Sequence, residues 1–116
     1  QPVEWIEANG NKALCYYSLG NYTSGQLAYP RVLGGMAKIT IVNDSDSIYI
    51  DQAGIIPIIT HYEWVKGTSL HKTYKLSDYT EKLEKRHSLN YYDSTFSIKN
   101  LQQLADQIIG DWIINQ

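Results

Sequence analysis

The sequence MAKITIVNDSDSIYID, residues 36–51, decides the fold class. Apolar and polar side chains alternate over residues 36–42 and again over 47–51, and the polar residues 43–46 separate the two runs. Alternation with a period of two places the apolar side chains on one face of a strand. Two such runs on either side of a polar turn are typical of a β-hairpin. We therefore predict two antiparallel strands, 36–42 and 47–51.

Apolar runs on both sides of this hairpin predict further strands. Residues 13–19 are rich in aromatic side chains and predict a buried strand, and residues 55–64 predict another. Pro57 has no backbone N–H, so we expect the second of these strands to start at an edge or a bulge. Residues 72–76 are compatible with one more short strand.

Glycine, proline and asparagine mark the breaks between these runs. Residues 2–6 predict either a short strand or a turn of helix, which the sequence Asn9-Gly10-Asn11 ends. Residues 20–35 contain four glycines and Pro30, a composition that predicts a loop rather than a regular element.

The pattern changes to a helical period in the last third of the chain. Ser77 predicts the N-cap of a helix near residues 78–87. Ser97 predicts the N-cap of a second helix near 98–109, which Gly110 ends. This second helix has apolar side chains three and four residues apart along one face. Strands followed by helices predict an α+β fold.

Composition limits the classes of function. The chain has 116 residues, the size of one domain, and a net charge of −2. Nucleic-acid binding needs a clustered basic face. The cationic residues of the segment 82–86 are interleaved with Glu84 and preceded by Glu81. We interpret them as a solvated helix face and expect no nucleic-acid partner.

Candidate nucleophiles and metal ligands are few. Cys15 is the single cysteine and lies in an apolar run, so we expect a buried thiol without catalytic reactivity. The three histidines, His61, His71 and His87, lack the spacing of a metal site. We therefore expect structural or surface histidines, and we assign no metal-binding or cofactor-binding residue to this chain.

The most specific motif is Tyr17-Ser18-Leu19-Gly20-Asn21-Tyr22, followed by Ser24 and Gln26. A glycine pair, Gly34-Gly35, then leads into the alternating strand. Together these residues resemble the C-terminal part of the CapA-type capsule biosynthesis proteins, also described as poly-γ-glutamate synthesis proteins. Residues 76–80, His87 and the final amphipathic helix are similar to the tail of that family. Tyr22 stands where the family usually has phenylalanine.

This resemblance implies a calcineurin-type metallophosphoesterase fold for the complete protein. The family's metal ligands lie in its N-terminal part, and the last of them, in a histidine-proline-histidine phrase, would precede Gln1. Residues 1–116 would then be a single segment, the C-terminal portion of a larger domain, and the lack of an initiator methionine agrees with upstream sequence. Divalent metal ions would be bound by that larger domain, while this chain would contribute strands and a covering tail.

The resemblance also implies partners and a location. The implied partner is the N-terminal remainder of the same protein, and an open sheet edge would allow a homodimer. The implied location is the bacterial cell surface or the extracellular space, with membrane attachment through sequence outside this chain. The resemblance leaves open whether the complete protein hydrolyses a phosphate ester or handles poly-γ-glutamate, and hence whether it is an enzyme.

Ser18 and Asn21 are the two residues that the motif connects to a site. At the end of a strand, their turn would form part of an active-site rim in the complete protein. A structural role is the alternative, because a sharp turn needs the left-handed backbone conformation that Gly20 and Asn21 tolerate.

A stand-alone interaction module at the cell surface is the alternative function. The chain has ten tyrosines and three tryptophans but only one phenylalanine. Tyrosine and tryptophan combine an apolar ring with a polar group and suit half-exposed contact faces. An exposed aromatic patch on a sheet without missing strands would favour the module. An open sheet edge or an exposed apolar face near Gln1 would favour a segment of a larger protein.

Overall fold

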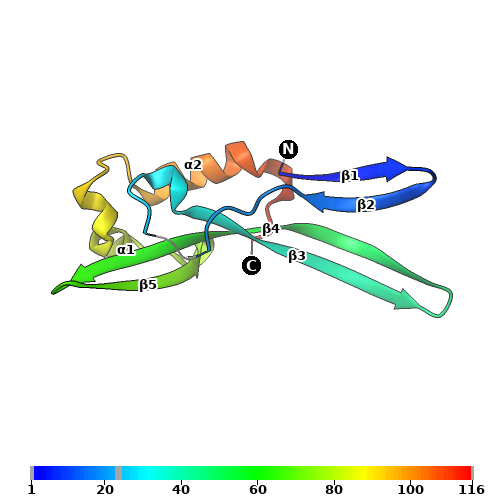
Figure 1. Ribbon diagram of the computed structural model, residues 1–116, viewed down its shortest axis with the longest axis horizontal. Coiled ribbons are helices and arrows are strands. Elements are labelled where there is room, and N and C mark those ends of the chain that lie inside the picture. The colour runs from blue at the N-terminus through cyan, green and yellow to red at the C-terminus, as the bar shows by residue number, and fades with distance from the viewer. Residues whose placement is uncertain (1, 23–24, 116) are drawn as a thin grey trace.

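The computed structural model describes residues 2–22 and 25–115 (Figure 1). It has two antiparallel sheets and two α-helices, which confirms the predicted α+β class. The first sheet pairs β1 with β2, and in the second β4 lies between β3 and β5. The strands are β1 (Val3–Ala8), β2 (Asn11–Tyr16), β3 (Leu33–Asp44), β4 (Ser47–Val65) and β5 (Thr68–Lys75), and the helices are α1 (Glu81–Arg86) and α2 (Ile98–Ile108).

The β1–β2 hairpin resolves the choice at the N-terminus in favour of a strand. Asn9 and Gly10 have φ values of 53° and 78°, the left-handed conformation that a two-residue hairpin turn requires. The strand predicted at 13–19 therefore begins earlier, at Asn11, and ends at Tyr16. Residues 17–19 lie outside it because the chain leaves the hairpin there, after Tyr17 N–H donates to the carbonyl of Pro2 (3.0 Å).

The predicted central hairpin is confirmed, but its strands are longer than expected. The strands expected at 47–51 and 55–64 are one continuous strand, β4. A β-bulge joins them, because Thr40 pairs with Gln52 while Ile41 pairs with Ile50, so that Asp51 has no partner. The bulge lets one strand continue through residue 51, where the interrupted alternation of apolar side chains predicted the end of a strand.

Pro57 lies in the middle strand of a three-stranded sheet, but at a position that β5 does not reach, so the expected edge position is confirmed locally, although the strand itself starts earlier, at Ser47. Alternate residues of a strand direct their backbone groups to the same side. The carbonyl of Ile55 points away from β3, because it accepts a hydrogen bond from Ile114 N–H (2.8 Å). The nitrogen of Pro57 faces that side too, where β5 has already ended at Lys75 opposite Ile58. A backbone donor is therefore not needed there.

The strand expected at 72–76 is the second half of β5, which starts at Thr68. Lys66 and Gly67, with φ values of 46° and 80°, form the two-residue turn between β4 and β5. Lysine is an uncommon residue at such a position, so the sequence pattern did not reveal this hairpin.

The first helix differs from its prediction, and the second agrees with it. α1 is shorter than 78–87, and Thr80 rather than Ser77 caps it, because the Thr80 hydroxyl accepts a hydrogen bond from Leu83 N–H (3.3 Å). Residues 76–78 form a 3-10 turn, and the extended backbone of Tyr79 separates it from α1. In α2, the Ser97 hydroxyl accepts from Asn100 N–H (3.0 Å), as expected.

The hydrophobic core lies under α2, at the middle of the molecule (Figure 1). The molecule measures 58 × 25 × 22 Å, and the β1–β2 hairpin and the tip of the β3–β4 hairpin project beyond the helices in the same direction. We call these two projections the arms. The core side chains come from the start of β1, from β4 and the residues around the start of β3, and from the segments after β5, and include Val3, Val32, Ile55, Ile59, Tyr62, Leu76, Tyr79, Leu89, Phe96, Leu101, Ala105 and Ile109.

Candidate functional site

The turn formed by residues 17–22 is anchored on both sides. Gly20, with a φ of 73°, forms a bridge with Gly34, and the carbonyl of Leu19 accepts a hydrogen bond from Gly35 N–H (2.6 Å). The carbonyl of Tyr22 accepts hydroxyl hydrogen bonds from two threonines of the sheet, Thr60 (2.8 Å) and Thr73 (2.7 Å). The turn is therefore attached to β3, β4 and β5 together.

The glycine pair at the start of β3 makes room for this turn. A Cβ atom on Gly34 would lie 2.5 Å from the carbonyl oxygen of Asn21, and one on Gly35 would lie 2.6 Å from the Cγ2 atom of Ile55. Both distances are shorter than van der Waals contact. The pair that contributed to the family resemblance thus has a physical role here, because only glycine allows the turn to approach β3 so closely.

The two candidate site residues, Ser18 and Asn21, make local hydrogen bonds. The Ser18 hydroxyl accepts from Gly20 N–H (3.4 Å), and the Asn21 side-chain amide donates to the carbonyl of Arg31 (3.2 Å). These bonds agree with a structural role for both residues, and they leave both side chains exposed. Ser24, another residue of the motif, lies outside the described residues.

Ser18 also lines a cavity of about 260 Å³ beside the turn. The lining residues carry no charged or titratable side chain. The cavity can therefore accommodate an apolar group, but its own residues cannot supply an acid, a base or a metal ligand. Its lining consists of Pro2, Ser18, Leu19, Gly20, Pro30, Leu33, Gly34, Gly35, Ile55, Ile108 and Ile109.

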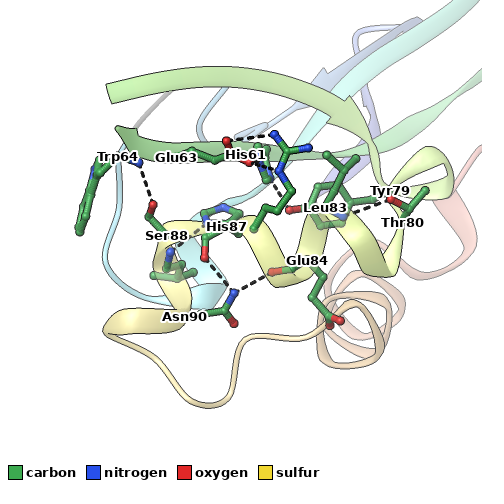
Figure 2. Close-up of polar contacts among 12 residues, drawn as sticks. His61, Glu63, Trp64, Tyr79, Thr80, Leu83, Glu84, His87, Ser88 and Asn90 are labelled. Carbon is green, nitrogen blue, oxygen red and sulfur yellow. Dashed lines mark hydrogen bonds and ion pairs between the residues drawn. The ribbon is translucent and has the colours of Figure 1, made fainter. Parts of the chain in front are cut away.

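A second cluster of polar side chains forms where β4 extends beyond the start of β3 (Figure 2). β3 begins at Leu33, opposite Ile59, so beyond that point none of the described strands lies along the edge of β4 that faces away from β5. Side chains that follow α1 take the place of a strand. The Nε2–H of His87 donates to the carbonyl of Thr60 (2.9 Å), and the Ser88 hydroxyl accepts from Trp64 N–H (2.8 Å). The helical segment is thereby fixed to this unpaired edge of the sheet.

His87 is a neutral histidine with a defined tautomer. Its Nδ1 accepts a hydrogen bond from Leu89 N–H (3.0 Å) while its Nε2 donates to Thr60. The pKa of His87 is lowered from 6.5 to about 4, mainly by burial and to a smaller extent by the nearby rings of His61 and His71. The hydrogen bond to Thr60 and the carboxylate of Glu63 act in the opposite direction and do not outweigh burial.

His61, on β4, belongs to a series of linked polar side chains. Its Nδ1 lies 2.6 Å from the hydroxyl of Tyr79, and its Nε2 lies 3.1 Å from Glu63, which also binds the guanidinium of Arg86 (2.8 Å). The hydrogen bond from His61, and then Arg86, hold the pKa of Glu63 below its usual value. Burial raises the pKa of Tyr79, so this phenol stays protonated and can donate to His61.

The end of α1, next to His87, is fixed by one amide. The side chain of Asn90 donates to the carbonyl of Glu84 (2.7 Å) and to that of His87 (2.8 Å), as Figure 2 shows. Among the described residues, every buried side-chain nitrogen and oxygen atom has a hydrogen-bond partner. The cluster therefore has no unsatisfied group that indicates a missing ligand, and we interpret it as structural.

The three histidines and the cysteine differ in their burial. His61 and His87 are buried and structural, and His71 is exposed, with its Nε2 2.7 Å from the Ser69 hydroxyl. Within residues 2–22 and 25–115, no group of three acidic, histidine or cysteine side chains is placed to hold a metal ion. Cys15 is half-buried rather than buried, because no helix covers its hairpin.

The sequence did not reveal the polar cluster itself. His61 and Glu63 are two residues apart in a strand, which places their side chains on one face, but the predicted apolar run at 55–64 gave no reason to connect them. Their partners Tyr79 and Arg86 lie in a segment whose helix was placed wrongly. That error concealed the contact, because the extended conformation of Tyr79 directs its ring towards His61.

Comparison of the chain with protein-family models, with curated proteins and with solved structures gave no significant match. None of the described helices is long and apolar enough to cross a membrane. The resemblance to the CapA-type family stays a prediction from sequence motifs.

The close approach of the turn to β3 generates the first prediction. In Gly34→Ala, the new methyl group would collide with the Asn21 carbonyl, so we expect a loss of about 2 kcal/mol in the free energy of unfolding. Gly25→Ala is the matched control, because its Cβ would meet a side-chain atom of His71 at an ordinary 3.4 Å. Urea denaturation measures both variants. Equal stabilities would contradict the proposed contact.

The neutral state of His87 generates the second prediction. Unfolded His87 binds a proton below pH 6.5, whereas folded His87 does so only below about pH 4. The unfolded state thus binds more protons in this window, and stability should fall by roughly 3 kcal/mol as the pH decreases from 6.5 to 4.

Urea denaturation at several pH values tests this, with His87→Gln and His71→Gln as variants. We expect a flatter pH dependence between 6.5 and 4.5 for His87→Gln, because carboxylates titrate mainly below that range. His71→Gln, at an exposed position, removes only the smallest of the influences on the pKa of His87, so most of the slope of the unmodified chain should remain. A steep slope that survives in His87→Gln would show that another group is responsible.

Proposed function

We propose that this chain is the C-terminal structural segment of a capsule or poly-γ-glutamate biosynthesis protein of the CapA type. The motif at residues 17–22 and the glycine pair Gly34-Gly35 support the proposal. In the complete protein, the N-terminal part would carry the metal ions of a metallophosphoesterase-like site. This chain would contribute the sheet and the turn beside it, and Ser18 and Asn21 would form part of the rim.

The observation that carries the proposal is the exposed apolar surface of the arms. Ile41 and Ile48 are 64% and 71% exposed, and Ile39 and Trp5 are 42% and 37% exposed. In β3 and β4, Ile41 pairs with Ile50, so their side chains share one face. Alternation along the strands places Ile39, Ile48 and Ile50 on the same face as Ile41, and an exposed apolar face of this kind marks a contact with another protein surface. A neighbouring part of the same polypeptide would cover it.

The open backbone edges support the same interpretation. β1 and β2 form a sheet of two strands, which is marginally stable without further contacts. β3 is likewise an edge strand of its sheet, and no described element lies along its outer half on the side away from β4 (Figure 1). Additional strands from the N-terminal part would satisfy these edges, and a second copy of the chain could also pair with them. We place the complete protein at the bacterial cell surface or outside the cell, attached to the membrane through sequence outside this chain.

A stand-alone interaction module is the second candidate. Trp64 and Tyr92 pack edge to face with ring centroids 5.0 Å apart, and both are exposed, as is Tyr91. These rings lie at the opposite end of β4 from the arms. Such a patch suits a contact face for a glycan, a peptide or another subunit. In this case the aromatic patch, and not the arms, would be the functional surface.

The third prediction distinguishes the two candidates in the complete protein. Ile41→Lys places a charge on the arm, and Val65→Lys places one at the other end of the sheet, where the side chain is 45% exposed. If the N-terminal part covers the arm, Ile41→Lys should lower the free energy of unfolding of the complete protein by about 2 kcal/mol or more. Val65→Lys should change this free energy by less than about 0.5 kcal/mol. Thermal unfolding followed by circular dichroism measures both.

The same two variants should also differ in the amount of polymer that cells carry. We expect Ile41→Lys to lower the amount of surface-bound polymer, measured as glutamate released by acid hydrolysis, and Val65→Lys to leave it unchanged. If Ile41→Lys changes neither stability nor polymer, the arms are not an internal contact. Loss of polymer from Val65→Lys alone would favour the interaction module.

A further inference from the structure

Charge is distributed unevenly along this chain. Residues 63–86 hold six of its ten lysines and arginines but only four of its twelve acidic residues. The remainder of the chain is therefore acidic. The basic segment forms the end of the molecule opposite the arms, where β5 and α1 lie close to the end of β4 (Figure 1).

A cleft of about 260 Å³ lies between β5 and α1 in this basic segment. Lys72 pairs with His61 across the two strands, and Leu70 pairs with Glu63, so these four side chains share one face of the sheet. Arg86 closes the cleft from the helix. The complete lining is His61, Glu63, Leu70, His71, Lys72, Tyr74, Leu83 and Arg86.

The one acidic side chain of the cleft is already neutralised. Both oxygens of Glu63 bind Arg86, at 2.8 and 3.2 Å, and one also accepts from His61. This bidentate contact fixes the guanidinium, and its remaining N–H groups make no hydrogen bond to any described residue. Arg86 thus presents unused donors in a preformed position.

Lys72 provides a second cation, which, unlike Arg86, is paired with no carboxylate of the described residues. Its Nζ lies 5.0 Å from the ring centroid of Tyr74, and no carboxylate of the described residues lies within 4.0 Å of it. The neighbouring acid Glu84 faces elsewhere, because its carboxylate accepts from Ile98 N–H (2.6 Å) at the start of α2. On α1, Lys82 lies one turn before Arg86 and adds positive charge on the same side of the helix.

We propose that this cleft binds an aliphatic carboxylate, with Lys72 and Arg86 holding the carboxylate group. The apolar part of the ligand would contact Leu70, Leu83 and the ring of Tyr74, which line the same cleft. This apolar wall favours an organic carboxylate over inorganic phosphate. The inference does not rest on the proposed function, because it uses only residues of this chain at the end away from the arms.

A chemical-shift titration of the full chain with sodium glutarate at constant ionic strength tests the proposal. We expect shifts of the backbone amides of residues 70–74 and 83–86, and a dissociation constant that rises about fivefold in Lys72→Met. Inorganic phosphate should bind more weakly than glutarate at the same residues. Raising the salt concentration should weaken both, because the cleft is open to solvent.

Lys12→Met is the matched control. Lys12 is also a strand lysine over an aromatic ring, with its Nζ 4.6 Å from the ring centroid of Trp5, but it lines none of the clefts described above. It should leave the affinity for glutarate unchanged. The proposal would be overturned if Lys72→Met had no effect, if Lys12→Met weakened binding equally, or if phosphate bound as tightly as glutarate. None of these outcomes bears on the contact of the arms.

Discussion

The structure depends on how the edge of β4 is satisfied after β3 ends. A strand edge that is buried without hydrogen-bond partners is costly, so some other group has to bind the backbone from Thr60 to Trp64. His87 and Ser88 do so with side chains rather than with a strand. This requirement explains why His87 is buried, why it is neutral, and why α1 lies against the end of the sheet.

The open strand edges at the two ends of β4 are treated differently. At one end, the polar cluster around His61 and His87 satisfies the edge, and the charged cleft lies on its surface. At the other end, the β3–β4 arm keeps exposed isoleucines and an open edge on β3. One strand of 19 residues thus connects a self-contained end with an end that lacks a cover. This contrast is the physical basis for proposing that the arms contact another part of a larger protein and that the cleft acts independently.

The sequence predicted those elements whose signals are local. The alternation around residues 43–46 and the N-cap Ser97 were sufficient for the central hairpin and for α2. The starts of β4 and of α1 were misplaced because features outside the local pattern decide them: a bulge lets β4 continue from Ser47 past Asp51, and burial of Tyr79 next to His61 keeps that residue extended. For the candidate site, the motif located the turn of Ser18 and Asn21 but not its anchors, since the threonines that bind its far end lie about 40 and 50 residues further along the chain.

The anchors of that turn limit what Ser18 and Asn21 can do. The glycine pair holds the turn against β3, and the Asn21 amide is already engaged by Arg31, so neither residue is free to move towards a substrate. A rigid rim positions groups that come from elsewhere, whereas a catalytic side chain needs an acid, a base or a metal next to it. The cavity beside Ser18 has no such group in its lining. If this turn belongs to a reactive site, its contribution is therefore the shape of the boundary, and the chemistry has to come from residues outside this chain.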